Sequence, residues 1–449
     1  MTDPQTSPAD AVVAPFYRAF WRWHFYAGLL IMPVLMLMAL TGGVYLFKDE
    51  IDGVIYRPLL SVEAAATSTT PQAWSKAATA AVPGRVVQIV PPAEPTRSVK
   101  LVVEQPSGAK RAVYVDPHDA RVLGSTADGG IMRVVQRLHS LDIAGPVANR
   151  LVEIVAGWAI VMVCTGVVLW WPRGQKGGVV SIRGAPKRRV FWRDLHAVTG
   201  VFAGAIIVFL AATGMPWSTV WGGNVRKLTT EAGWGQPAPP GGGGHGAHKA
   251  AAPAPSGAVP WALQETHMHA GHHMAASLSL DDALARIDAA GLPRPYVLSI
   301  PADPGEAWSA AYMPDKVERT RTLYLDGGDG RVIADIGYGQ FGPAAKTIEW
   351  GIAVHQGNQF GLVNKLIMLA GCIAVWLLGV SALVMWWKRR PKGRLAAPPR
   401  PVERKAYVAL AAVVVPLAIL YPLVGASLIA VLAVDLIVRR VGASMRRAR

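Results

Sequence analysis

The chain has 449 residues, of which 52% are hydrophobic and only 16% are charged. This composition excludes an ordinary soluble protein and indicates membrane spans. The net charge of +16 does not indicate a nucleic-acid partner, because the basic residues cluster beside the apolar runs.

Four apolar runs are each long enough for a helix that crosses a bilayer, which takes about 20 residues. The first run lacks a small-residue cleavage site and is interpreted as an uncleaved anchor. A fifth apolar region, 406–438, contains Pro416 and Pro422 and has basic segments at both ends, which favours a hairpin over a single crossing. The four apolar runs are roughly 25–47, 148–171, 197–221 and 362–387, and they lie in the segments 16–47, 139–171, 194–221 and 351–387.

Lysine and arginine in short loops predict the orientation of these spans. Segment 172–193 carries seven such residues, segment 388–405 carries eight, and the tail 439–449 carries five. All three are therefore predicted to be cytoplasmic, in a bacterial inner membrane, as is the N-terminal tail 1–15. The remaining segments are predicted to be periplasmic: a small α+β domain at 48–138, a linker at 222–274 and a second small α+β domain at 275–350.

The chain repeats itself internally. A shift of 172 residues places His24 on His196, and a shift of 216 residues places His139 on His355. The periplasmic segments repeat as well, because "YVDPHDARVLG" at 114–124 matches "YLDGGDGRVIA" at 324–334. Each match follows a helix-like stretch and a strand-like stretch, "SVKLVVEQ" in the first copy and "YVLSI" in the second. The predicted fold is mainly α: a duplicated four-helix transmembrane bundle, two small α+β domains and a C-terminal apolar hairpin.

The repeated histidines form the candidate site. His24 and His196 start spans near the cytoplasm, whereas His139 and His355 precede spans on the periplasmic side. Each could be an ordinary polar residue in the membrane interface, but four in symmetric register favour a function. Paired imidazoles on facing helices suit the axial ligation of haem iron. Gly28 and Gly200, one turn after His24 and His196, would leave room for a flat macrocycle.

Two haems, one at each face, would imply electron transfer across the membrane. A covalent c-type haem is excluded because the chain has no C-x-x-C-H motif, so the predicted cofactor is haem b, two per chain. The chain also lacks a dinucleotide fingerprint, so the electron donor is predicted to be another molecule, either cytoplasmic or a quinol.

Four segments resemble the PepSY-associated transmembrane helix family: "WRWHFYAGLLIMPVLMLMALTGGVYLFKDEID", "RLHSLDIAG…TGVVLWWPR", "WRDLHAVTGVFAGAIIVFLAATGMPW" and "VHQGNQFG…MWWKRRP". The family includes ferric-siderophore reductases and iron-uptake membrane proteins of Gram-negative bacteria. The resemblance implies a haem-binding core and two periplasmic PepSY-like domains. It also implies reduction of a ferric chelate with release of Fe(II), and haem ligands at His24, His139, His196 and His355. The chain departs from the family pattern at Gln356, where a threonine is usual.

The linker contains a cluster of histidines and methionines with no counterpart in the first half of the chain. Imidazole and thioether ligands together suit copper. The cluster could therefore capture a periplasmic metal ion, or it could be a disordered loop that binds metals weakly. The candidate metal ligands are His267, His269, His272, His273, Met268 and Met274, with His245 and His248 nearby.

Two further features carry alternatives. Hydroxyl residues late in the spans are expected to bond to their own helix backbone, although some could touch haem propionates. Asp194 is expected to be a solvated residue at a helix start, although it could instead orient His196. The hydroxyl residues are Thr41, Thr165, Thr213 and Ser381.

The sequence thus predicts a haem-dependent metalloreductase whose substrate is a ferric siderophore or another metal chelate, with no catalytic residue assigned. Two alternatives without redox catalysis stay open. In one, the PepSY-like domains bind a protein or peptide partner and the spans only anchor them. In the other, the protein handles periplasmic copper through the histidine and methionine cluster.

Overall fold

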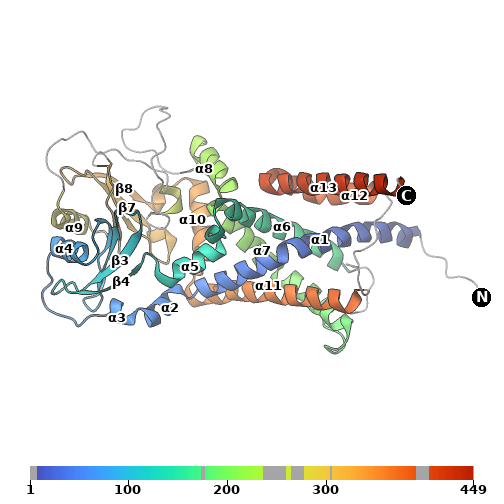
Figure 1. Ribbon diagram of the computed structural model, residues 1–449, viewed down its shortest axis with the longest axis horizontal. Coiled ribbons are helices and arrows are strands. Elements are labelled where there is room, and N and C mark those ends of the chain that lie inside the picture. Colours follow the sequence, from blue (N-terminus) through green and yellow to red (C-terminus); the bar gives the residue numbers. More distant parts are fainter. Residues whose placement is uncertain are drawn as a thin grey trace, which may run out of the picture. The chain divides into compact units, whose positions relative to one another are not determined.

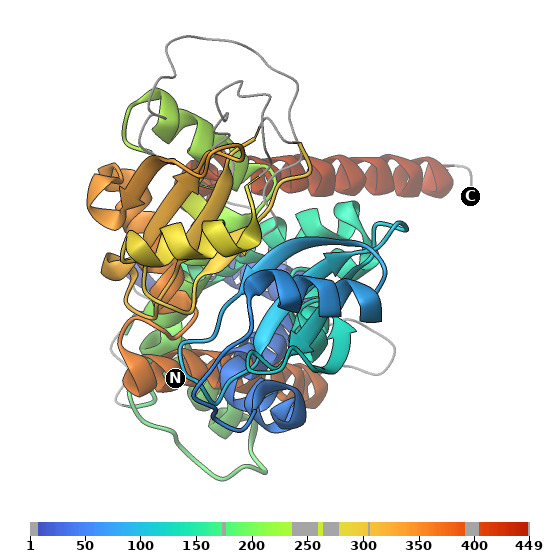
Figure 2. The same ribbon diagram turned by 90° about the vertical axis from the view of Figure 1, so that its left-hand side faces the viewer.

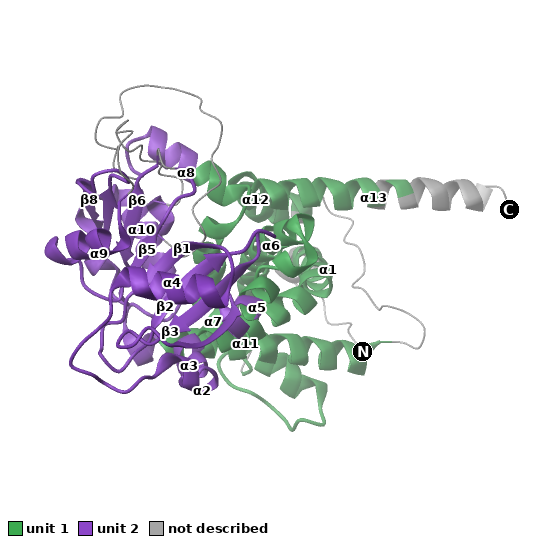
Figure 3. Ribbon diagram, turned by 60° about the vertical axis from the view of Figure 1, so that its left-hand side comes forward, with its two compact units in different colours: residues 1–46, 135–225, 365–449 green, residues 47–134, 226–364 purple. Residues whose placement is uncertain are grey.

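The computed structural model divides the chain into two compact units (Figure 3). The helical unit comprises residues 1–46, 135–225 and 365–449, and the sheet unit comprises residues 47–134 and 226–364. The residues that the structure describes are 8–172, 177–235, 259–263, 278–303, 306–390 and 404–447.

Among these described residues, four helices are long and apolar enough to cross a membrane, which confirms the predicted membrane character. Each exceeds the length of about 20 residues that a bilayer requires. The last of them, α11, has its first residues, up to Asn364, in the sheet unit. The four helices are α1 (Pro8–Tyr45), α6 (Pro146–Trp170), α7 (Arg189–Gly214) and α11 (Gly361–Arg389) (Figure 1).

The second and fourth spans, α6 and α11, begin close to the predicted apolar runs at 148 and 362, and later than the segment limits 139 and 351. The two predicted histidines there are instead the last residues of separate short helices, α5 (Gly130–His139) and α10 (Pro343–His355). The chain breaks before each span at a glycine with positive φ, Gly145 at 91° and Gly361 at 60°. Glycine adopts this backbone conformation without steric cost, so these positions end one helix and allow another to start.

Basic residues gather at one end of the helical unit. The guanidinium of Arg389, at the end of α11, lies 4.1 Å from the ring centroid of Trp21, near the start of α1. The ammonium of Lys388 donates to the carbonyl of Lys187, in the loop before α7, at 2.9 Å. These contacts bring residues of the segments 172–193 and 388–405 to the same end of the helical unit, where α1 begins.

The C-terminal apolar region forms two helices, α12 (Arg404–Leu420) and α13 (Pro422–Arg447), separated by Tyr421. Both pack against α6 of the helical unit. At Gly157 of α6, an added Cβ would lie 2.3 Å from Cγ2 of Val424, so only glycine fits there. The apolar parts of α12 and α13 are shorter than a full bilayer crossing.

The sheet unit contains one antiparallel sheet of eight strands in the order β4-β3-β2-β1-β5-β6-β7-β8. The first four strands come from one half of the chain and the last four from the other, joined where Ile89 of β1 pairs with Leu298 of β5. The strands are β1 (Arg85–Val90), β2 (Val99–Glu104), β3 (Lys110–Val115), β4 (Val122–Ala127), β5 (Val297–Ser299), β6 (Trp308–Tyr312), β7 (Arg321–Leu325) and β8 (Val332–Gly337).

This continuous sheet differs from the two separate α+β domains that the sequence predicted. An edge strand has unpaired backbone groups, and the edge strands β1 and β5 satisfy each other by pairing. The equivalence of the strands also differs from the prediction. β5 corresponds to β1, because each follows a helix directly, whereas the sequence had matched "YVLSI" with the residues of β2.

Two helices, α4 (Pro71–Ala81) and α9 (Leu280–Ala289), lie across one face of the strands (Figure 2). Both begin at hydroxyl caps: Thr70 accepts from Ala73 N at 3.2 Å, and Ser279 accepts from Asp282 N at 3.1 Å. One hydrophobic core beneath them contains residues of both halves. The other helices described in or entering this unit are α2 (Lys48–Ile55), α3 (Arg57–Leu60), α8 (Trp221–Glu231) and the 3-10 turns Trp261–Leu263, Val317–Arg319 and Tyr338–Gln340.

The matching sequences 114–124 and 324–334 have the same local structure. In both, an aspartate starts the turn and accepts a backbone N–H two residues later, Asp116 from His118 at 2.9 Å and Asp326 from Gly328 at 2.8 Å. Both hairpins also shift register at the same point, next to Tyr114 and next to Tyr324. The turn is therefore encoded by the repeated aspartates, whereas the residues between them are free to differ.

Candidate functional site

Two of the four predicted histidines face each other inside the helical unit. The ring centroids of His24, on α1, and His196, on α7, are 6.3 Å apart, and the rings are nearly perpendicular at 86°. An imidazole nitrogen binds a metal ion at about 2 Å, so two imidazoles on opposite sides of one ion have centroids roughly 6 Å apart. The observed separation therefore suits a shared metal ion.

Each ring is held through Nδ1 by a neighbouring helix. Nδ1 of His24 lies 3.0 Å from Oγ1 of Thr165, on α6. Nδ1 of His196 lies 3.0 Å from Oγ of Ser381, on α11, and 3.1 Å from the carbonyl oxygen of Leu378. The two histidines thus bring together all four long helices of the unit.

These contacts assign the proton on the imidazole of His196. A carbonyl oxygen can only accept a hydrogen bond, so Nδ1 of His196 must donate to Leu378. In a neutral imidazole the other nitrogen, Nε2, then keeps its lone pair. His24 has the equivalent backbone hydrogen bond, to Met162. Both rings therefore present Nε2 as the atom that can bind a metal ion.

His139 is held in the same way on a different part of α1. Its Nδ1 lies 3.0 Å from the carbonyl oxygen of Met38 and 3.1 Å from Oγ1 of Thr41. Thr41 lies 17 residues after His24 on the same helix, which is roughly 26 Å along its axis. Burial lowers the pKa of His139 below its usual value, so the ring is neutral and its Nε2 is also available.

His355 belongs to the sheet unit, where it is the last residue of α10. His139 belongs to the helical unit, so the structure describes the two residues in separate units. The prediction that His139 and His355 form a second pair therefore stays a prediction from the sequence.

Glycines next to the hydroxyl residues leave space for two of the rings. An added Cβ at Gly166 would lie 3.3 Å from Cε1 of His24, and one at Gly42 would lie 3.1 Å from Cε1 of His139. Gly28 and Gly200 were predicted to leave room for a cofactor. A Cβ at Gly200 would meet only Leu378 at 3.6 Å, an ordinary contact, whereas one at Gly28 would meet Met162 at 3.2 Å.

The expectation that Asp194 is a solvated residue is wrong. Its side chain is fully buried and accepts from Nε of Arg183 at 2.8 Å and from Nη2 of Arg193 at 2.6 Å. It does not bond to His196, whose Nδ1 partners are on α11. A buried carboxylate requires charged partners, and these are Arg183 in the loop before α7 and Arg193, the neighbour of Asp194 in α7.

A second buried carboxylate in the helical unit caps a helix. Glu153, on α6, is 1% exposed, and its Oε2 accepts from the backbone N–H groups of Val220 and Trp221 at 3.2 and 3.1 Å. These are the first groups of α8, where a helix has unsatisfied donors. These partners lie 67 and 68 residues further along the chain, so only the fold shows them.

The predicted metal ligands of the linker, His267, His269, His272, His273, Met268 and Met274, lie outside the described residues, as do His245 and His248. Within the part of the chain that the structure describes, no group of three or more His, Cys, Asp or Glu side chains is placed to hold a metal ion.

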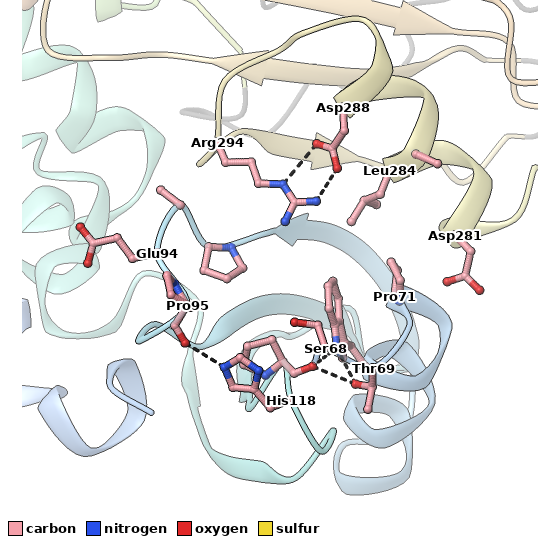
Figure 4. Close-up of a pocket in the computed structure, with 15 residues that line it drawn as sticks. Ser68, Thr69, Pro71, Glu94, Pro95, His118, Asp281, Leu284, Asp288 and Arg294 are labelled. Atoms are coloured by element: carbon pink, nitrogen blue, oxygen red, sulfur yellow. Dashed lines mark hydrogen bonds and ion pairs between the residues drawn. The ribbon is translucent and has the colours of Figure 1, made fainter. Parts of the chain in front are cut away.

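The sheet unit has a cavity of about 480 Å³ between α4, α9 and the turn that contains His118 (Figure 4). This volume is typical of small-molecule sites, which measure roughly 300–1,000 Å³. Basic and acidic groups both face it, and Arg294 donates to Asp288 at 3.2 Å. The chief lining residues are Trp74, Pro95, His118, Asp281, Asp288 and Arg294.

His118 is protonated by its surroundings. Its Nδ1 lies 2.7 Å from the carbonyl oxygen of Thr67, and its Nε2 lies 2.8 Å from the carbonyl oxygen of Pro95. Both carbonyls can only accept, so both ring nitrogens donate, which requires the imidazolium. These two hydrogen bonds raise the pKa of His118 above its usual value. The repeat did not indicate a role for His118, because its counterpart in the second copy is a glycine, Gly328.

Comparison with known proteins identifies one family. A family model described as PepSY-associated TM region matches residues 21–389 of the chain. No curated protein sequence matches it. The matched range contains all four candidate histidines, the apolar helices α6, α7 and α11, and most of α1.

Proposed function

We propose, from the premise that this chain belongs to the PepSY-associated TM family, that it is a b-type haem oxidoreductase of the bacterial inner membrane. It would pass electrons across the membrane to reduce a periplasmic ferric chelate, such as a ferric siderophore, and release Fe(II). One observation carries the proposal: His24 and His196 face each other at 6.3 Å, with Nδ1 occupied and Nε2 free to ligate.

The residues fit the proposed cofactor. His24 and His196 would hold the haem iron through their Nε2 atoms, which suits a haem that carries electrons rather than one that binds a substrate at iron. When bound, haem supplies a one-electron couple that no protein side chain offers. The chain's own groups hold Nδ1 of both rings and so fix the tautomer of each. The second haem, at His139 and His355, is proposed from the sequence repeat.

The proposed topology rests on charge. The end of the helical unit with Arg389, Lys388 and the loop before α7 would face the cytoplasm, as the positive-inside rule predicts. His24, three residues after Trp21, would then be on the cytoplasmic side, where it could receive electrons from a cytoplasmic donor or a quinol. The sheet unit would be periplasmic and PepSY-like, and the bundle would be a duplicated pair of spans.

The test is an absorption spectrum of the detergent-purified full chain, oxidised and dithionite-reduced, with haem quantified per chain. We expect the sharp reduced α-band of six-coordinate haem b at about two haems per chain. His24→Ala should remove about one haem, whereas His118→Ala, a control in the sheet unit, should remove none. A chain that contains no haem, even after supplementation during expression, would overturn the proposal. Reoxidation of the reduced protein by a ferric siderophore, compared with Cu(II), would identify the acceptor.

The cavity of the sheet unit favours one alternative, in which this unit binds a small ligand or a peptide and the spans only anchor it. This alternative predicts full function in His24→Ala and loss of function in variants of the cavity. The copper-handling alternative rests on the linker histidines. It predicts that deletion of 241–274 abolishes function while the bundle histidines stay dispensable.

A further inference from the structure

Three histidines of this chain are held by the same local construction. A hydroxyl residue late in a helix donates to the carbonyl four residues earlier: Thr41 to Leu37 at 2.8 Å, Thr165 to Val161 at 2.9 Å and Ser381 to Leu377 at 2.6 Å. The histidine Nδ1 then contacts the hydroxyl oxygen and the carbonyl three residues before it. The resulting contacts are His139 with Thr41 and Met38, His24 with Thr165 and Met162, and His196 with Ser381 and Leu378.

The direction of each hydrogen bond follows from this geometry. Because the hydroxyl proton is directed to the helix's own carbonyl, the hydroxyl oxygen is left as an acceptor for Nδ1–H. A threonine that bonds only to its own helix would do nothing for the histidine. Here the hydrogen bond from the hydroxyl to its own helix turns the lone pairs of the hydroxyl oxygen toward the histidine. The expected backbone bond and the contact with the histidine therefore occur together.

The residue after the hydroxyl completes the construction in two of the three cases. Gly42 follows Thr41, and an added Cβ there would lie 3.1 Å from Cε1 of His139. Gly166 follows Thr165 and stands in the same relation to His24, at 3.3 Å. The neighbouring Gly43 makes only an ordinary contact, 3.6 Å from Cβ of Cys372, so glycine is required by the ring at one position and not at the next.

We propose that the pairs Thr41–Gly42 and Thr165–Gly166, together with Ser381, are positioning residues that fix the tautomer and the angle of His139, His24 and His196. The hydroxyl and the carbonyl hold Nδ1–H, and the missing side chain lets the ring approach the helix, so that Nε2 points away from it. The proposal rests on the proposed function in one respect: the group that Nε2 binds is haem iron. Threonine-glycine pairs in these spans are thereby part of the ligand site and not only helix-packing residues.

The first test compares two adjacent glycines. Gly42→Ala and Gly43→Ala add the same methyl group to the same helix, with the same gain in helix propensity. We expect Gly42→Ala to weaken haem retention about 10- to 100-fold at the position of His139, the range observed when a partner of a metal ligand is lost. Gly43→Ala should retain haem as the unaltered chain does. Equal retention in the two variants would overturn the role of Gly42.

The second test separates the hydroxyl from its methyl group. Thr165→Val removes the acceptor of His24 at nearly constant volume, whereas Thr165→Ser keeps it. We expect Thr165→Val to shift the low-spin EPR g-values and lower haem retention, and Thr165→Ser to restore both. Ser381→Ala should act likewise at His196, whereas Ser427→Ala, which removes a hydroxyl bonded to Trp158 at 2.9 Å, should leave the haem signals unchanged.

The outcomes distinguish the two proposals. An unaltered chain without haem would overturn the proposed function. An unaltered chain with haem, combined with Thr165→Val and Ser381→Ala variants whose haem retention and EPR signals match it, would overturn the positioning role alone. Size-exclusion profiles of all variants show whether each has folded, and a misfolded Thr165→Val would leave Thr165→Ser against Thr165→Ala as the deciding pair.

Discussion

The helical unit and the sheet unit both contain repeated sequences, but different parts of the repeat are retained in each. In the helical unit the repeated residues form the candidate site: His24 and His196 occupy matching positions and face each other. In the sheet unit the repeated residues form the turns between paired strands. Asp116 and Asp326 build the same turn, whereas His118, which lines the cavity in one copy, is replaced by Gly328 in the other.

The difference follows from what each unit requires. A metal ion between two helices would need a ligand from each helix, so the histidine would have to be kept in both copies of the repeat. A cavity needs only one set of facing groups, so its two halves can diverge as long as their strands still pair. Symmetry therefore indicates the candidate cofactor site in the helical unit, and asymmetry indicates the candidate ligand site in the sheet unit.

The largest expected effect tests whether the helical pair acts as one site. His24→Ala and His196→Ala should each lower the haem content by about one per chain, and the double variant should lose no more than either single variant. Residues that hold the same group act as a unit, so their losses do not add. Haem per chain by the pyridine haemochrome assay gives the measurement. Additive losses would mean that the two histidines serve different cofactors.

The next effect concerns a buried acid of the sheet unit. Burial raises the pKa of Glu349 from 4.5 to about 7, against the hydrogen bond from Ala262 N at 2.8 Å. The folded state therefore holds the proton more tightly than the unfolded state, so stability falls as pH rises from about 4.5 to about 7. The free energy of unfolding should fall by about 3 kcal/mol more over this pH range in the unaltered chain than in Glu349→Gln. Thermal unfolding at a series of pH values measures it, and parallel profiles for the two proteins would contradict the prediction.

A smaller effect concerns packing in the helical unit. Gly157→Ala places a methyl group against Val424 and should destabilise the unit by about 1–3 kcal/mol through overpacking. The midpoint of thermal unfolding in detergent should fall by a few degrees. Gly223→Ala is the matched control, because an added Cβ there meets nothing within 4 Å. A midpoint that is the same for both variants would show that α13 does not depend on this contact.

The smallest effect concerns His118, whose protonated ring joins Thr67 to Pro95. The pKa of His118 is higher in the folded protein than its value of 6.5 in the unfolded chain. Protonated His118 therefore stabilises the fold fully below pH 6.5, and this stabilisation is lost as the pH rises through the pKa of the folded protein. Hydrogen exchange of residues 62–71 should therefore accelerate at high pH beyond the intrinsic base-catalysed rate. His118→Gln should remove this excess. The turn at 326–331, which lacks a histidine, is the internal control, and an equal acceleration there would contradict the prediction.

The sequence was a good guide to the helical unit and a partial one to the sheet unit. Hydropathy located four spans to within several residues, since a bilayer demands an uninterrupted apolar run of fixed length. It did not show that His139 and His355 end separate short helices before α6 and α11, because these breaks depend on glycine conformations that composition does not reveal. The pairing of β1 with β5 could not be predicted, because the sequence of a strand does not show whether another strand pairs with its open edge.

The sequence by itself determined the membrane character, the family and the four histidines, because apolar length and repeated spacing are properties of the chain alone. Only the tertiary structure decided which helices hold His24, His139 and His196, because their hydrogen-bond partners lie about 100 to 185 residues away in sequence. It likewise decided that Asp194 is buried between two arginines. A charged residue at the start of a helix is expected to be exposed to solvent, and only the fold shows that a loop covers it.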